Sequence, residues 1–251
     1  MNSKPYSDLY LHKIGGWSAI LSGLLFGILT FYLYVFLGAL GFKPVMFDDH
    51  TLLHPWVAEH IRLYQLSWIF YFLTQLFLIP VPYVLAHYFQ RGNGKLKALA
   101  KLSATFGTTA IAITVLCPII FYAASPITAQ AYVATDAAQS QELVLAMSAL
   151  MTDIPKEIRL FSEVFLGIWL MLAGFLFRRS TRVQGVGWLT FVTGFWTVSI
   201  VSIKIFDPSN PLEDFLGIVL SVNYTVIGLH LLRSLHIQKS LNQPANSIDL
   251  R

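Results

Sequence analysis

Charged side chains inside apolar stretches of the sequence are the first candidates for chemistry. Glu163 and Lys204 both interrupt long apolar runs, and Arg159 belongs to the same candidate polar site. A lone charge within a bilayer costs at least ~2.5–3.5 kcal/mol on insertion scales, so it usually faces the interior of a helical bundle and finds a partner there. We expect Glu163 and Lys204 to point into the bundle, near enough to interact. Two interpretations stay open: a structural ion pair near the headgroups, or a substrate or proton site.

Two amide side chains form a second candidate group. Gln75 and Asn223 fall near the centres of apolar runs. A buried amide in hydrocarbon needs a hydrogen-bond partner. These residues are therefore expected either to join neighbouring helices or to provide the polar contacts of a ligand pocket inside the bundle.

A third group combines residue types that bind metals. His50, His54, Glu59 and His60 lie close together in the sequence. The zinc motif H-E-x-x-H requires Glu beside the first of two His residues that are one helical turn apart. Here Thr51 follows His50, so we assign no metal site. The other interpretation of this cluster is a solvated polar loop that ends in an interfacial helix.

Catalytic signatures of other kinds do not occur in the sequence. It contains no G-x-S-x-G motif, and Cys117 has no sequence neighbour that would lower the pKa of its thiol. We therefore expect no cofactor and no nucleophilic catalysis.

The composition shows which elements must position these residues. The 251-residue chain is 55% hydrophobic and 12% charged, whereas soluble domains carry about 25% charged residues. So few charges predict a membrane protein. The basic residues lie in short loops between apolar runs, which argues for membrane orientation and against nucleic-acid binding.

Six apolar runs are long enough to cross a hydrocarbon core that requires about 20 residues. We predict an all-α bundle of six transmembrane helices in a single domain, 1–251. The predicted spans are residues 14–40, 66–88, 102–122, 158–177, 186–206 and 212–232.

The positive-inside rule orients these spans. With the N-terminus inside, 12 of the 17 Lys and Arg residues fall on the inner side. We therefore predict that both termini are cytoplasmic, in the inner (plasma) membrane of a bacterium, with residues 89–101 and 178–185 on the same side.

Two longer segments are predicted at the outer face, residues 41–65 and 123–155. In the first, Pro55 and Trp56 suggest an interfacial helix that leads into the second span. In the second, apolar residues between Leu143 and Met151 recur at helical spacing. We expect an amphipathic helix that lies on the outer surface or over the bundle, with Pro155 in the first turn of the following span.

Small residues and prolines predict details of the packing. Gly23 and Gly27 on the first span, and Gly167 and Gly174 on the fourth, would let two backbones approach closely. Internal packing and dimerisation are both compatible with this pattern. Pro80 and its neighbour Pro82 should kink the second span, because proline lacks an N–H.

Several segments resemble a family of bacterial multi-pass membrane proteins known as domain-of-unknown-function family forty-three eighty-six. The resemblance is carried by HKIGG at 12–16, GIWL at 167–170, GFLFRRS at 174–180, VGWL at 186–189, and Gly194. It implies a multi-pass membrane fold and assigns no roles to residues.

Two classes of function follow from the sequence. The first is a non-enzymatic carrier, sensor or accessory subunit that binds a small molecule, a lipid or a membrane-protein partner. The second is a membrane enzyme with an outer-face site that acts on a lipid or an envelope precursor. The absence of catalytic motifs favours the first class.

Overall fold

The computed structural model describes residues 5–90, 94–135, 137–180, 184–207 and 213–242. Within these ranges the protein is helical and has no strand, and six helices are long and apolar enough to cross a membrane. The all-α, six-helix fold class is thus confirmed, and every predicted span overlaps one of these helices. Predicted inner-side positions such as Arg91, Arg182 and Arg251 lie outside the described residues.

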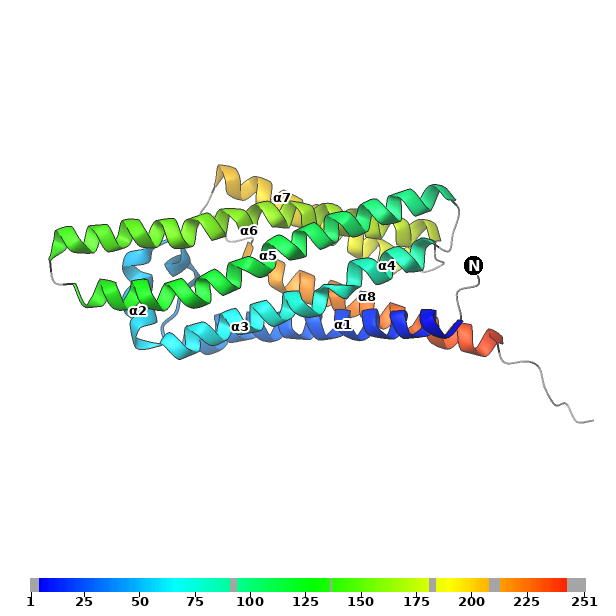
Figure 1. Ribbon diagram of the computed structural model, residues 1–251, viewed down its shortest axis with the longest axis horizontal. Coiled ribbons are helices and arrows are strands. Elements are labelled where there is room, and N and C mark those ends of the chain that lie inside the picture. The colour runs from blue at the N-terminus through cyan, green and yellow to red at the C-terminus, as the bar shows by residue number, and fades with distance from the viewer. Residues whose placement is uncertain (1–4, 91–93, 136, 181–183, 208–212, 243–251) are drawn as a thin grey trace, which may run out of the picture.

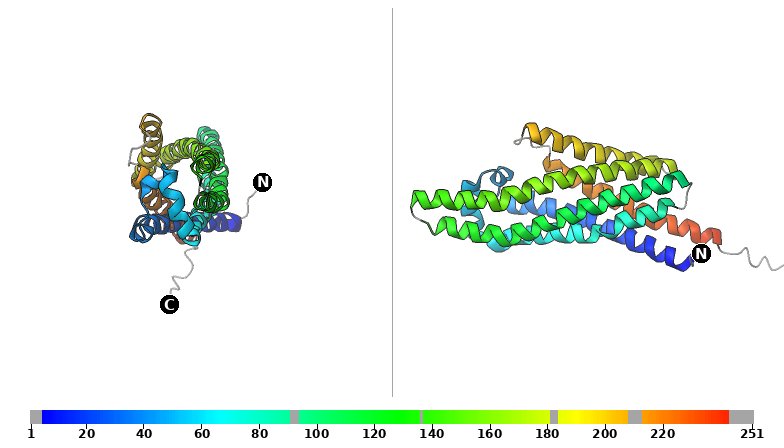
Figure 2. Two further views of the ribbon diagram at one scale, coloured as in Figure 1. Left: turned by 90° about the vertical axis from the view of Figure 1, so that its left-hand side faces the viewer. Right: turned by 45° about the horizontal axis from the view of Figure 1, so that its top comes forward.

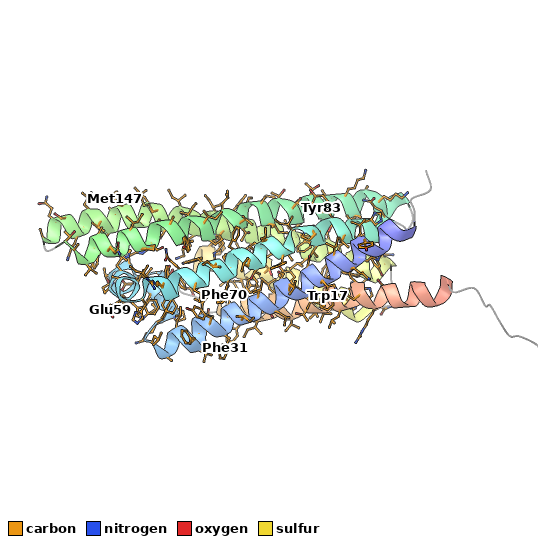
Figure 3. The ribbon with its side chains drawn as sticks, turned by 60° about the horizontal axis from the view of Figure 1, so that its bottom comes forward. Trp17, Phe31, Glu59, Phe70, Tyr83 and Met147 are labelled. Carbon is orange, nitrogen blue, oxygen red and sulfur yellow. The ribbon has the colours of Figure 1, made fainter. Side chains whose placement is uncertain are left out.

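The helices run roughly along one long axis (Figures 1 and 2). The first crossing consists of α1 (Pro5–Phe31) and a π-helical segment, η1 (Tyr32–Leu37). A short 3-10 helix, η2 (Pro44–Phe47), and α2 (His50–Glu59) follow. α2 crosses the end of the bundle, and Figure 3 views it nearly end-on beside Glu59.

The second crossing is divided at the prolines. α3 (Ile61–Leu78) ends at Leu78, and only Ile79 separates it from Pro80, which begins α4 (Pro80–Gln90). Because Pro80 and Pro82 have no N–H, they cannot continue the hydrogen-bond ladder of α3 but fit the first turn of a new helix. The predicted kink is confirmed.

A long helical hairpin dominates the next part of the chain. α5 (Gly94–Val133) has 40 residues and α6 (Ala138–Ser180) has 43. At 1.5 Å per residue each is about 60 Å long, roughly twice the thickness of a hydrocarbon core. The hairpin therefore reaches beyond the other helices at one end (Figures 1 and 2). Met147 lies on this projecting part (Figure 3).

The expectation of a separate surface helix within 123–155 is wrong. Leu143 to Met151 is helical, but the helix runs straight on through Pro155 into the crossing segment. Pro155 is not the start of a new helix, because α5 packs along α6 and supports the continuous helix. The Cys117 thiol of α5 donates to the Pro155 carbonyl at 3.3 Å.

The last two crossings are α7 (Gln184–Phe206) and α8 (Glu213–Asn242). α7 packs against α6, and α8 packs against α1. A Cβ built on Gly174 would lie 2.4 Å from the Phe191 nitrogen of α7, and one on Gly23 would lie 2.7 Å from the Ser221 carbonyl of α8. Both glycine faces therefore serve internal packing, as the first of the two alternatives predicted.

Two apolar clusters fill the bundle. The larger joins the helices around Trp169, Leu170 and Tyr224, all of which are buried. The smaller lies under α2, where Trp56 and Val57 pack with Leu37 and Tyr64. α2 is therefore a packed part of the bundle end.

Candidate functional site

The centre of the candidate site is an ion pair within α6. Arg159 Nη1 lies 3.2 Å from Glu163 Oε1, one helical turn away, and the Glu163 side chain is 7% exposed. Among the described residues, Glu163 Oε2 has no hydrogen-bond partner. One carboxylate oxygen is therefore neutralised by the guanidinium group, and the other remains open to a hydrogen-bond donor.

Two tyrosines from other helices adjoin this pair. The Tyr71 hydroxyl of α3 is within hydrogen-bonding reach of the Arg159 guanidinium group. The buried Tyr224 of α8 is close enough to interact electrostatically with Tyr71 and Glu163. Three helices thus bring polar groups to one place inside the bundle.

Lys204 approaches the same place from the last turn of α7. Its charge acts on Arg159 and Glu163, and also on Asp48 and Lys156 at the bundle end. The predicted partner of Glu163 is therefore in its electrostatic surroundings, while the direct ion pair is with Arg159.

Hydrogen bonds to α5 fix the position of α6 at this level. Ser162 Oγ lies 2.7 Å from Thr114 Oγ1 of α5 and donates to the Arg159 carbonyl at 2.6 Å. Since Ser162 is adjacent to Glu163, these contacts hold the backbone that carries the ion pair.

The predicted amides lie in the same interior. Gln75 is buried one turn along α3 from Tyr71. Asn223, which adjoins Tyr224 on α8, accepts a hydrogen bond from Thr190 of α7 at 3.2 Å. Its Nδ2 has no partner within the described ranges. Asn223 therefore links two helices and also keeps an unused donor.

The predicted outer cluster divides into two parts. His50 and His54 stack with ring centroids 5.5 Å apart, and His50 Nε2 lies 3.3 Å from Asp153 Oδ1 of α6. His60 instead stacks on Trp56, and its Nδ1 lies 3.0 Å from the Trp56 carbonyl oxygen. Glu59 is exposed at the far end of α2. In the described part of the chain, no group of three or more His, Cys, Asp or Glu side chains could hold a metal ion.

Sequence reasoning missed several members of these sites. Tyr71 precedes Gln75 by one helical turn, so helical spacing from that amide would have found it, whereas Tyr224 directly follows Asn223 and helical spacing gives no signal for it. It also missed an aromatic cluster at the opposite end, where Tyr88 Oη lies 3.3 Å from His230 Nε2. The His230 ring also meets Phe177 edge-on at 5.4 Å.

The chain belongs to the DUF4386 family, described as a domain of unknown function, whose model matches residues 11–234. The predicted resemblance is thus confirmed over nearly the whole chain. No curated protein and no solved structure matches it. Family membership therefore brings no ligand, partner or reaction with it.

Proposed function

We propose that this DUF4386 member is a non-enzymatic membrane protein that binds a small molecule inside its bundle, as a carrier, a sensor or an accessory subunit. One observation carries the proposal: Glu163 is buried within an apolar helix, and only one of its carboxylate oxygens is paired with Arg159. A lipid or a membrane-protein partner could present the same chemistry to this site.

The physical argument rests on the cost of buried polar groups. Burying a polar group without a hydrogen bond costs roughly 1–3 kcal/mol in proteins, and buried groups without partners are few. Glu163 Oε2 can only accept a hydrogen bond, while Asn223 Nδ2 can only donate. A molecule that carries both an N–H or O–H group and an acceptor oxygen would complement the interior.

The proposed orientation places this site in the outer half of the bundle. The beginning of α5 and the ends of α6 and α8 lie toward the same end as the beginning of α1, at the right of Figure 1, and these segments carry Lys97, Arg178 and Arg233. The positive-inside rule assigns that end to the cytoplasm. The projecting hairpin and α2 would then face the outside of a bacterial inner membrane.

Cysteine labelling tests the orientation. In a Cys117→Ala background, single cysteines at Asn93 and Ser140 should be labelled from opposite sides of intact cells by a membrane-impermeant reagent. Labelling of both from the outside would contradict the six-span orientation.

Native mass spectrometry of the purified chain tests the binding site. We expect a bound small molecule or lipid that disappears in Glu163→Gln and persists in the matched control Glu142→Gln, which changes an exposed residue of the same helix. An identical adduct pattern in both variants would contradict the proposal.

A membrane enzyme with an outer-face site is the second candidate. The observation in its favour is that Asp153 holds His50 at 3.3 Å, since a carboxylate that orients an imidazole is suited to general acid–base catalysis. Turnover of a lipid or an envelope precursor that is lost in His50→Gln and retained in Glu163→Gln would favour this alternative.

A further inference from the structure

The contact between α2 and the hairpin includes a group of titratable side chains. His50 Nε2 lies 3.3 Å from Asp153 Oδ1 and 3.2 Å from Thr152 Oγ1. Just before α2, Asp48 forms an ion pair with Lys156 of α6. The first turns of α2 are therefore held to α6 by contacts that depend on charge.

His54 occupies the buried side of this contact. His54 is 1% exposed, and neither nitrogen of its ring has a hydrogen-bond partner among the described residues. Its ring lies between that of His50 and that of Tyr132 on α5, whose centroid is 5.4 Å away. A neutral imidazole can occupy this position, whereas an imidazolium would be a desolvated charge without a partner.

We propose that α2 is an acid-sensitive clasp, and that protonation of His54 releases its first turns from the α5–α6 hairpin. Release of the clasp would change the charges around the Arg159–Glu163 site, so this part rests on the proposed function. The connection is electrostatic: Lys204 acts on Asp48 and Lys156 at the clasp and on Glu163 in the interior.

The charged groups around His54 determine the direction of the effect. They are His50 on α2, Asp153 and Lys156 on α6, and Asp48 before α2. Tyr132 faces the ring from α5. A proton on His50 attracts Asp153 and also repels a proton on His54, because the two rings are stacked. Acidification therefore places a charge on His54 at the buried side of this contact.

The pKa of His54 sets the pH range. Burial, assisted by the charge of His50, lowers this pKa from 6.5 to about 4. Because the pKa in the folded state lies below that in the unfolded state, the stabilisation is complete above about pH 6.5. It is lost progressively as the pH falls from there toward about 4, where His54 in the clasped state takes up a proton.

Apolar contacts limit the movement to one end of α2. Leu53, Trp56 and Val57 of α2 pack with Tyr64 in the smaller core cluster, so release of the first turns also requires Leu53 to leave this cluster. His60 interrupts the helix between α2 and α3. The second half of α2 should therefore stay in place while the half that carries His50 and His54 moves away from the hairpin.

Distance measurement between spin labels tests the clasp directly. Leu52→Cys and Glu142→Cys change exposed residues of α2 and α6, and Cys117→Ala removes the native thiol. In the full chain in nanodiscs, we expect the interspin distance to lengthen and broaden reversibly between about pH 7 and about pH 4, a range that covers the ordinary pKa of histidine and the lowered pKa of His54. An unchanged distance over this range would overturn the proposal.

Matched variants identify the trigger. His54→Phe keeps an aromatic ring against Tyr132 but cannot take up a proton, so the distance should become independent of pH. His54→Gln serves the same purpose if the phenylalanine variant does not fold. His50→Gln should still show the shift, and its loss there would overturn the role of His54. These measurements need no ligand, so a failed clasp is distinguishable from a failed binding site.

Discussion

The two ends of the bundle handle buried polar groups in different ways. Toward the α2 end, Arg159 and Glu163 place two charges in the interior and leave one carboxylate oxygen open. Toward the other end, Tyr88 Oη lies 3.3 Å from His230 Nε2, and aromatic rings such as Phe177 adjoin this contact. Apolar side chains including Leu78, Leu176 and Ile227 fill the core of the bundle.

This difference distinguishes the candidate binding site at Arg159 and Glu163 from the aromatic cluster around Tyr88 and His230. The aromatic end gains stability from ring contacts at favourable edge-on geometry, and Tyr88 and His230 meet each other within it. A buried ion pair contributes little net stability and is costly to break. We therefore propose that Glu163 serves binding, whereas the aromatic end serves packing.

Removal of the guanidinium group should have the largest effect. Arg159→Met leaves Glu163 buried without its direct ion-pair partner, and we expect unfolding in detergent to become easier by about 3–5 kcal/mol. The double variant Arg159→Met/Glu163→Gln should recover much of that loss. Equilibrium unfolding followed by circular dichroism measures both. A double variant as unstable as the single one would show that the pair does not act as a unit.

Truncation of Phe177 at the aromatic end should lower the free energy of unfolding about as much as a large cavity in a protein core does. Phe177→Ala removes a ring that packs edge-on against Phe89 with centroids 4.8 Å apart, and we expect a loss of about 3 kcal/mol. The bound adduct seen by native mass spectrometry should persist in the folded fraction. Disappearance of the adduct would show that the aromatic end contributes to the binding site, contrary to the difference drawn between the two ends.

Close packing between α6 and α7 should be sensitive to a single methyl group. Gly174→Ala brings a Cβ against the backbone of Phe191, and we expect a loss of about 1–3 kcal/mol. Gly185→Ala is the matched control, since a Cβ there would meet nothing within 4 Å. Equal melting temperatures for the two variants would contradict the close approach of these helices.

The smallest effect is expected for one hydroxyl group. Tyr88→Phe removes the contact with His230 but keeps the ring, and hydrogen bonds between membrane helices average about 0.6 kcal/mol. A shift of the unfolding midpoint near the limit of detection is expected. A loss of stability comparable to that of Arg159→Met would show that the two ends depend on their buried polar contacts to the same degree.

Some features of the fold were predictable because they depend on the properties of single residues or short segments. A span requires about 20 apolar residues, so the six crossings could be counted. Pro80 cannot donate to the helix ladder, so the division between α3 and α4 was predictable. Gly174 and Gly23 lack a Cβ, which marked the faces that meet α7 and α8.

Other features had no local signal. Pro155 fits the first turn of a helix and also the interior of a supported one, and the sequence alone could not choose between these positions. Arg159 lies one turn from Glu163, yet Lys204 was the expected partner because depth in the membrane was the available criterion. The contact of His50 with Asp153 joins residues 103 positions apart.

The sequence by itself determined the number of spans, their composition and the places where backbones can approach, because each depends on what one residue can or cannot do in lipid. Tertiary structure decided which polar groups meet. Tyr71, Glu163 and Tyr224 come from three helices, and their proximity depends on the rotation and depth of each helix. Packing against neighbouring helices fixes those two quantities, and no stretch of sequence contains them.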